Sequence, residues 1–268
     1  MELETYYGMD SNPFTKKIDI NDLYKSNDYI QMENRLDFLI RSRGVGVFLS
    51  NPGMGKTTCL RDTLSRLNAS RYKVIYICMT TVTVLDFYRL LNDALGLAET
   101  MRKSQMFRQI QEELRRLITE NKMEVIIAID EVQFLKKDIL KEFIMLLNFD
   151  YDSKDYCTLI LTGQNEFLRV LRFKELEAFR QRININYTFT GLDEKEVEEY
   201  IKTRLKLVNC REDLFEKEAY HTFYTLMQGS VRNLNQLINK SLIIGQHKEK
   251  ETIGSEIIME SSEEVILK

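Results

Sequence analysis

The chain has 268 residues, 44% of them hydrophobic and 29% charged, and its formal net charge is −3. This length and apolar share allow one large α/β domain, or a core domain with a small appendage. The mildly acidic balance excludes a dedicated nucleic-acid coat protein, so any DNA contact must come from a local strip of Lys and Arg.

The N-terminus, cysteines and histidines limit the compartment and the cofactors. Residues Met1–Thr5 are acidic and polar, which fits neither a signal peptide nor a transit peptide, and no apolar run is long enough to span a membrane. The four cysteines form no CxxC pair, and His221 and His247 are too far apart to suggest a metal site. We therefore expect a cytoplasmic protein with reduced thiols and no membrane contact.

Five short apolar or β-branched runs are typical of buried strands, and helical patterns fill the gaps between them. The runs are Val45–Leu49, Lys73–Cys78, Val125–Asp130, Tyr156–Thr162 and Ile183–Phe189. The clearest helical pattern covers Ser104–Asn121, with Ser104 as the expected N-cap. Strands that alternate with helices predict an α/β fold whose parallel five-stranded sheet is flanked by helices.

The strand pattern stops after about Thr190. Gly191–Asp193 is typical of a turn in which Asp193 caps a helix, and helical patterns follow at about 193–208, 215–227, 231–245 and 254–266. We expect residues 1–190 to form the core domain, and residues 191–268 to form a small all-helical lid domain with a C-terminal tail.

A phosphate-binding motif follows the first expected strand. The segment Ser50–Thr58, with the sequence SNPGMGKTT, opens a helix directly after that strand, which is the context that a P-loop needs. Its glycines let backbone N–H groups turn toward phosphate oxygens, and the helix N-terminus adds partial positive charge. Lys56 is placed to reach the β- and γ-phosphates of ATP, and Thr57 to bind Mg²⁺. The predicted nucleotide-binding residues of this loop are Asn51, Pro52, Gly53, Met54, Gly55, Lys56, Thr57 and Thr58.

A second motif ends the apolar strand Val125–Asp130. Asp130 is expected to hold Mg²⁺ through water beside Thr57, and Glu131 to polarise the attacking water. A glycine-rich turn or a solvated strand end would explain either motif alone, but their joint occurrence favours an ATP site. The carboxylate of Glu131 favours an ATPase over a GTPase or a kinase.

Further polar positions are candidates for the same site, each with a structural alternative. After the fourth strand, Gln164 is the first choice and Thr162 the second for a side chain between Mg²⁺ and the γ-phosphate; a helix cap explains this position equally well. Arg180 and Arg182 precede the fifth strand. Either could reach a neighbouring subunit's ATP as an arginine finger, or simply pair with nearby acids. Arg232, on the first turn of a lid helix, is placed to fold over the nucleotide unless it is only solvated.

Together these segments resemble the AAA+ ATPases of the ExeA/TniB type, which include the transposition regulators TnsC, MuB and IstB. The resemblance runs from Tyr6 to about Ile244. Beyond the two general ATPase motifs, it is carried by Tyr7–Phe14, Leu161–Gln164, Phe179–Ile183 and Gly229–Leu234. It implies a P-loop AAA+ core over residues 1–190 and a helical lid over residues 191–268.

The resemblance also implies roles and an assembly. Asn12 and its neighbours would pack near the adenine, and Gln164 would be the first sensor. Arg182, with Arg180 as backup, would be the finger, and Arg232 the second sensor on the lid. The subunits would form a homo-oligomer, either a ring or a helical filament, with ATP at their interfaces.

One branch of the family is a secretion ATPase with a membrane helix and a peptidoglycan-binding extension, and the other is compact and serves transposons. Since neither addition is seen in this sequence, we expect the second branch: an ATPase that assembles on double-stranded DNA and recruits or activates a DDE-type transposase. A secretion-type ATPase acting on protein partners is the alternative. A regulatory switch that hydrolyses little ATP is a third hypothesis, against which Glu131 counts.

The expected DNA contacts follow the second strand. Thr81, with Thr80 and Thr83 beside it, and the pair Arg102 and Lys103 form a short cluster that can bind phosphates without reading bases. A plain surface loop explains these residues equally well.

Overall fold

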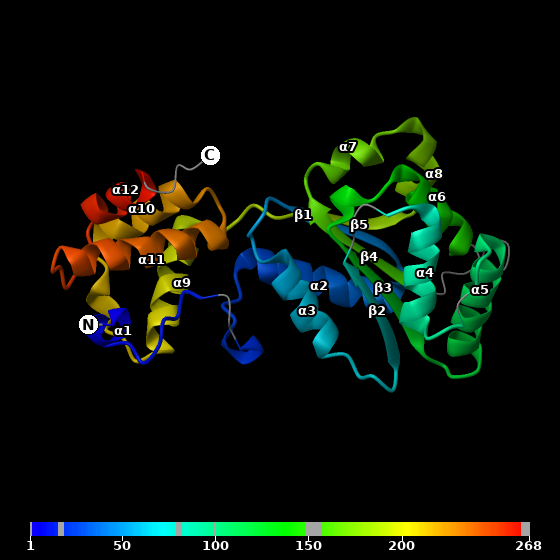
Figure 1. Cartoon of the computed structure of the whole chain (residues 1–268), viewed down its shortest axis with the longest axis horizontal. Coiled ribbons are helices and arrows are strands. Elements are labelled where there is room, and N and C mark those ends of the chain that lie inside the picture. Colours follow the sequence, from blue (N-terminus) through cyan, green and yellow to red (C-terminus); the bar gives the residue numbers. More distant parts are fainter. Residues whose placement is uncertain (1, 16–18, 79–81, 99, 148–156, 264–268) are drawn as a thin grey trace. The chain divides into compact units, whose positions relative to one another are not determined.

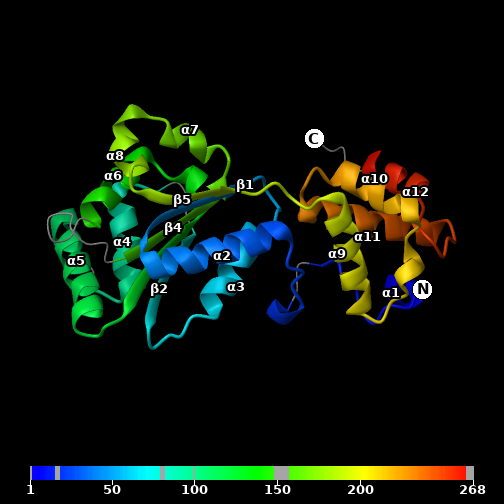
Figure 2. The same cartoon turned by 180° about the vertical axis from the view of Figure 1, so that it is seen from behind.

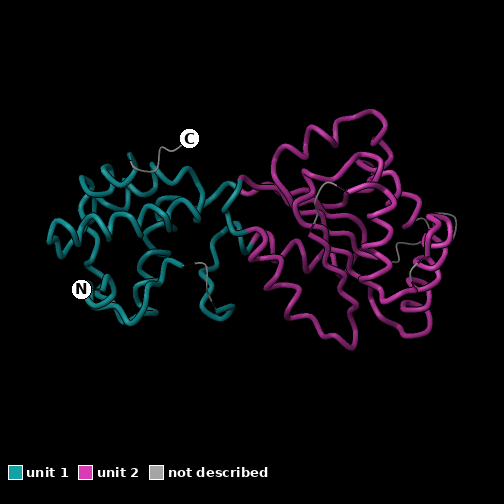
Figure 3. Tube along the Cα trace, in the orientation of Figure 1, with its two compact units in different colours: residues 1–30, 52–55, 190–268 teal, residues 31–51, 56–189 magenta. Residues whose placement is uncertain are grey.

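The computed structural model describes residues 2–15, 19–78, 82–98, 100–147 and 157–263. The chain divides into two compact units, which are coloured separately in Figure 3. The sheet unit contains residues 31–51 and 56–189, and the helical unit contains residues 1–30, 52–55 and 190–268. The N-terminal 30 residues, which the sequence analysis places in the core domain, thus group with the lid helices in this division.

Five parallel strands form the centre of the sheet unit, in the order β2-β3-β4-β1-β5 (Figures 1 and 2). They are β1 (Gly44–Ser50), β2 (Tyr72–Cys78), β3 (Glu124–Asp130), β4 (Cys157–Gln164) and β5 (Ile183–Thr188). The predicted α/β fold with a parallel five-stranded sheet is therefore confirmed, with strand bounds close to the predicted ones. Tyr156, the expected start of the fourth strand, lies outside the described residues.

Helices cover both faces of this sheet. One face carries α2 (Asn27–Ser42) and α3 (Lys56–Ser65); the other carries α4 (Val84–Leu95), α5 (Lys103–Thr119), α6 (Lys137–Leu146), α7 (Phe167–Leu171) and α8 (Glu177–Arg180). Alternate residues of β1 face the two layers, since Val45 and Val47 join the core on the face that α4 to α8 cover. On the other face, a Cβ added to Gly46 would lie 2.4 Å from Leu39 of α2, so this glycine permits close helix packing.

The long helix α5 is held in place by the burial of one apolar face. Met106, Ile110, Leu114 and Leu117 recur at helical spacing, and all four are buried against the sheet. The helix begins at Lys103, with Arg102 at the N-cap. The prediction that Ser104 is the N-cap is therefore wrong, because the helix starts before Ser104. The apolar residues on one face of α5, and not a capping side chain, determine its position.

Two short 3₁₀ helices complete the described part of the sheet unit, η2 (Val132–Phe134) and η4 (Lys174–Leu176). The helical unit contains α1 (Leu3–Tyr7), η1 (Ile20–Asp22), α9 (Glu194–Lys206), η5 (Glu212–Leu214), α10 (Lys217–Met227), α11 (Val231–His247) and α12 (Ser255–Glu263). Asp193 caps α9 as predicted, through a reciprocal capping box with Glu196. The N-terminal segment joins this unit through its aromatic residues, since Tyr7 and Phe14 are buried with the helices and the Tyr7 hydroxyl donates to the Leu242 carbonyl at 2.9 Å.

The core of the sheet unit offers a stability test at Phe143. Its side chain is fully buried, and its ring lies 4.8 Å from that of Phe87 in an edge-to-face arrangement. We expect Phe143→Ala to lower the free energy of unfolding by about 3–5 kcal/mol, because it removes buried surface and leaves a cavity. The matched change Phe38→Ala, at a side chain that is 62% exposed, should cost under about 1 kcal/mol. Urea unfolding measures both, and equal losses would contradict this assignment of the core.

Candidate active site

The site lies at the carboxyl ends of the central strands. The loop after β1 ends where α3 begins at Lys56, and Ser50 of β1 is the register partner of Gln164 of β4. On the other side of β4 lies β3, which ends in Asp130. Parallel strands present their carboxyl ends at one edge, which is where open α/β sheets bind ligands. The sheet order thus brings together the motifs that the sequence keeps far apart.

Asp130 is the most heavily bonded side chain of the site. It is 2% exposed, and its Oδ2 accepts from the hydroxyls of Thr57 at 2.8 Å and Tyr76 at 3.2 Å. Its Oδ1 accepts from the Thr162 hydroxyl at 2.7 Å and from the backbone N–H of Glu131 at 2.9 Å. Four donors therefore compensate the buried negative charge and fix the carboxylate in place.

Thr57 and Asp130 fit the Mg²⁺ ion predicted for them. A hydroxyl and a carboxylate oxygen 2.8 Å apart are hard oxygen donors, the kind that Mg²⁺ prefers. In the described ranges, no group of three or more His, Cys, Asp or Glu side chains could hold a metal ion. A cation held here would complete its shell with water and phosphate oxygens, as Mg²⁺ does in nucleotide sites.

Lys56 is buried to 7% exposure at the start of α3. Its Nζ donates to the backbone carbonyl of Gly163 at 2.7 Å and lies 3.5 Å from the Ser50 hydroxyl. Burial lowers the pKa of the Lys56 ammonium below its usual value, while the negative charges of Asp130 and Glu131 act in the opposite sense. Phosphate oxygens can compete with the Gly163 carbonyl for this ammonium group.

Glu131 lies in the left-handed backbone region, with φ of 58°. A non-glycine residue there is uncommon, and such strain is concentrated at functional sites. Its Oε2 accepts from the side-chain amide of Gln133, whose Oε1 in turn accepts from the backbone N–H of Gln164 at 2.9 Å. No role was predicted for Gln133 from the sequence. Its only sign there is that it is a polar residue two positions after Glu131.

The two sensor candidates have different surroundings. The Thr162 hydroxyl is fully buried on Asp130, whereas Gln164 is half-buried and is held through its backbone. Tyr76 was not foreseen either. Burial, together with Asp130, raises the pKa of the Tyr76 hydroxyl above its usual range, so this group stays a hydrogen-bond donor to the carboxylate.

Within the helical unit, the backbone N–H of Arg232 donates to the Gly53 carbonyl at 3.2 Å. Gly53 has a φ of 81°, and a Cβ there would lie 2.7 Å from the Arg232 Cβ, so only glycine fits. This unit also contains Asn12, which donates to the Asn239 side chain and accepts from the Phe14 N–H at 2.9 Å. The nucleotide contacts of Asn12 and Arg232 stay predictions.

The two arginine-finger candidates are also placed differently. Arg180 donates to the Leu171 carbonyl of its own chain at 2.9 Å. Arg182 lines a surface cavity of about 270 Å³, together with Phe179 and residues at the amino ends of β1 and β4. This places Arg182 at the end of the sheet opposite to the P-loop, and its role as the finger stays a prediction.

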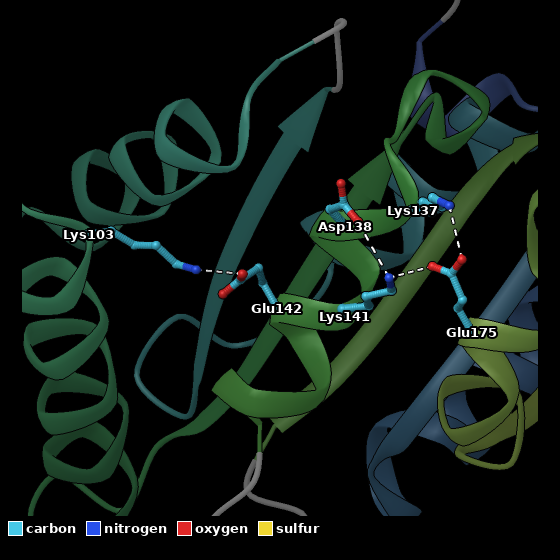
Figure 4. A network of polar contacts seen from close by, with 6 residues as sticks. All are labelled: Lys103, Lys137, Asp138, Lys141, Glu142 and Glu175. Atoms are coloured by element: carbon cyan, nitrogen blue, oxygen red, sulfur yellow. Dashed lines mark hydrogen bonds and ion pairs between the residues drawn. The ribbon is translucent and has the colours of Figure 1, made fainter.

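Of the expected DNA contacts, Thr81 and Thr80 lie outside the described residues. Lys103 points from α5 to α6, where its Nζ lies 2.5 Å from Glu142 Oε1 (Figure 4). Glu142 is 8% exposed and also accepts from the Tyr88 hydroxyl at 2.8 Å. Lys103 therefore compensates the buried charge of Glu142. Reversing the charge of Lys103 would destabilise its contact with α6, whether or not Lys103 binds DNA. Arg102, which is exposed, gives the cleaner test.

A second polar cluster appears beside this ion pair in Figure 4. Lys137 and Lys141 both point to Glu175, at 3.2 and 2.5 Å, and Lys141 also lies 3.6 Å from Asp138. These charges are half-exposed, so each pair adds little stability in water. Their effect is to neutralise the lysines of α6, which leaves this helix a poor candidate for a phosphate-binding surface.

Comparison with known proteins agrees with this geometry. Residues 40–171 match the family model described as the AAA domain. The chain is 27% identical over 250 residues to General secretion pathway protein A of Aeromonas hydrophila, covering 91% of this chain and 45% of that protein. Cdc6p from Pyrobaculum aerophilum matches with a TM-score of 0.71 and 18% identity, over 95% of this chain and 71% of the other. The Aeropyrum pernix ORC1 protein in complex with DNA matches with a TM-score of 0.66 and 16% identity, over 94% and 68%.

The match of residues 40–171 to the AAA domain, together with the P-loop site, supports an ATPase of the AAA+ kind, and this fold implies nucleotide binding. The match to the secretion protein further supports an ATPase of the ExeA type. This chain spans less than half the length of that relative. Across the described ranges, no helix has both the length and the apolar character needed to cross a bilayer.

The buried ammonium of Lys56 provides a test of the phosphate site. We expect Lys56→Met to weaken ATP binding by about 100-fold or more, since a charged hydrogen-bond donor is replaced by an apolar group of similar length. Titration with a fluorescent ATP analogue measures this, with Lys217→Met, at an exposed lysine of α10, as the matched control. Parent-like affinity in Lys56→Met would show that this lysine does not contact phosphate.

Proposed function

We propose that this chain hydrolyses Mg·ATP at the interfaces of a homo-oligomer, either a ring or a helical filament. We further propose that the ATP-loaded assembly binds double-stranded DNA and recruits or activates a DDE-type transposase. The hydrolysis step is supported above all by one observation: Lys56 and Asp130 are buried side by side at the strand ends, with Thr57 on Asp130 and Glu131 directly after it. The transposase partner follows from the sequence resemblance alone.

The catalytic steps follow from these positions. The Lys56 ammonium is near enough to exchange the Gly163 carbonyl for oxygens of the β- and γ-phosphates. Thr57 and Asp130 would hold Mg²⁺, which neutralises phosphate charge when bound. Glu131 orients and polarises the water that attacks the γ-phosphorus in line with the leaving ADP oxygen. Thr162 holds Asp130 in position through its hydrogen bond.

The oligomer is supported by the place of Arg182. This residue directly precedes β5, at the amino ends of the parallel strands, whereas the P-loop follows their carboxyl ends. A strand as long as Gly44–Ser50 spans roughly 20 Å at about 3.3 Å per residue. An arginine side chain cannot cross that distance to its own ATP. If Arg182 contacts a γ-phosphate, that phosphate belongs to a neighbouring subunit.

DNA binding is supported by exposed cations on α5 and at its N-cap. Arg102, Arg108 and Arg115 are exposed, and within the described part of the chain none of them is in an ion pair. Arg108 and Arg115 lie on one side of the helix, roughly 10 Å apart at about 1.5 Å per residue, and Arg102 is the N-cap residue before the first turn. One subunit would hold DNA weakly through so few charges, but an ATP-dependent stack would repeat them along the duplex. Such repetition can raise apparent affinity by about 10²–10⁴ without new contacts.

A second candidate function is favoured by the match to General secretion pathway protein A, which covers 91% of this chain. In that case the same ATPase cycle would act on protein partners, and the cations of α5 would be an ordinary solvated surface. The two functions share the catalytic site. They differ in whether ATP makes the assembly bind duplex DNA.

The finger can be tested by mixing subunits. Arg182→Ala should leave ATP binding unchanged but lower the hydrolysis rate by about 10³-fold or more, because charge on the transferring phosphoryl group loses its stabilisation. Adding Lys56→Met subunits should restore part of the rate, since they supply Arg182 to a neighbour that still binds ATP. Arg172→Ala, at an exposed residue after α7, is the control. Absence of rescue, with only monomers sedimenting in ATP, would exclude a finger acting between subunits.

Filter binding with ATP, with ADP and without nucleotide tests the DNA function. We expect duplex binding only with ATP, with little sequence preference and a steep loss of affinity as salt rises. Arg102→Ala should weaken binding to all sequences alike and reduce the salt dependence by about one released counterion per subunit. The same change at the exposed Arg41 of α2 is the control. If the protein binds duplex DNA in none of the three nucleotide states, the protein-directed function replaces this proposal.

A further inference from the structure

Three consecutive hydrogen bonds link Lys56 to Glu131 through two amide groups. The Lys56 ammonium donates to the Gly163 carbonyl at 2.7 Å. The same peptide unit carries the N–H of Gln164, which donates to Gln133 Oε1 at 2.9 Å. The side-chain nitrogen of Gln133 then donates to Oε2 of Glu131. Two amide groups, one from the backbone and one from a side chain, thus join the P-loop lysine to the carboxylate after β3.

Every bond of this chain points in the same direction. It starts at a cation and ends at an anion, and both amides are aligned with their donor sides toward Glu131. Aligned amides between opposite charges polarise one another and strengthen each bond. The chain is therefore a stiff connection between the two groups, in a part of the site where both are at least half-buried.

The orientation of the Gln133 amide follows from its partners. A backbone N–H can only donate, and an ionised carboxylate can only accept, so the amide oxygen must face Gln164 and the nitrogen must face Glu131. A glutamate here would lack the donor, and a lysine would lack the acceptor. Asparagine carries both groups but is one methylene shorter. Glutamine is thus the side chain that satisfies both neighbours from this position.

Gly163 lets the two sides of the chain approach each other. A Cβ on this residue would lie 2.8 Å from Gln133 Oε1 and 2.6 Å from a methyl carbon of Val132. Such contacts would push η2 away from the end of β4. The glycine of the Gly163–Gln164 pair therefore has a steric role in bringing Gln133 within reach.

We propose that Gln133 is the positioning residue for Glu131: it anchors one carboxylate oxygen to the end of β4, so that the other faces the attacking water. This inference rests on the catalytic role proposed for Glu131. The strained backbone of Glu131 agrees with it, because residues held in this backbone region are concentrated at functional sites. Gln133 touches no reacting atom, and it acts only through the carboxylate that it holds.

The test compares Gln133→Met with the parent in steady-state ATPase assays. Methionine keeps the length but removes both hydrogen bonds, so kcat should fall by about 10–100-fold while the Kd for ATP stays within about twofold. Gln105→Met, at an exposed glutamine of α5, is the matched control and should leave both constants unchanged. Thermal unfolding compares the stability of the variants.

A double variant separates positioning from a structural effect. In a Glu131→Gln background, Gln133→Met should not lower the residual single-turnover rate further, because the carboxylate that it would misplace is already gone. A further fall of the same size, or an unchanged kcat in Gln133→Met alone, would overturn the inference. If Gln133→Met does not fold, Gln133→Glu decides in its place: it keeps the acceptor for Gln164, loses the donor, and should show the same fall in kcat and the same lack of effect in the double variant.

Glu131→Gln measured alone shows which proposal has failed. If this variant hydrolyses ATP at the parent rate, the catalytic role of Glu131 is wrong and the inference falls with it. If Glu131→Gln stops turnover while Gln133→Met, or Gln133→Glu in its place, retains the parent kcat, only the positioning role of Gln133 is wrong.

Discussion

The carboxylate of Asp130 is the constraint on which the rest of the site depends. A buried negative charge is costly unless it is fully bonded, and its donors come from three other segments: α3, β2 and β4. Satisfying this one group therefore fixes how these segments end relative to β3. The groups that we propose to bind phosphate and Mg²⁺ are thereby aligned by the need to solvate one buried charge.

The adjacent carboxylates of Asp130 and Glu131 have different surroundings. Asp130 has both oxygens occupied by four donors and is fixed, whereas Glu131 lies on a strained backbone and is half-buried. A saturated carboxylate suits a structural and metal-holding role, and a less encumbered one suits contact with water. The different roles that we propose for these two neighbours thus follow from the backbone turn that separates their side chains.

The P-loop, the pair Asp130 and Glu131, and the five strands were predictable because each has a local signature: a glycine pattern, paired acids, or an apolar run. Gln133, Tyr76 and the partner of Lys103 were not, because their roles exist only once distant segments meet. The sequence showed Lys103 as a free cation, and only the folded structure reveals the buried Glu142 of α6 that it neutralises. The grouping of the N-terminal segment with the helical unit similarly depends on Tyr7, which bonds Leu242 far along the chain.

The contacts of Lys56 and Thr57 have a consequence for the kinetics of ligand exchange. Both side chains already have protein partners, the Gly163 carbonyl and Asp130, so an incoming phosphate or cation exchanges one set of bonds for another and does not order loose groups. Little conformational entropy is lost on binding, which is the benefit of preorganisation. If Lys56 and Thr57 hold ATP and Mg²⁺ as proposed, the same partners can recapture both side chains when product leaves, so the protein itself would compete with ADP and favour its departure.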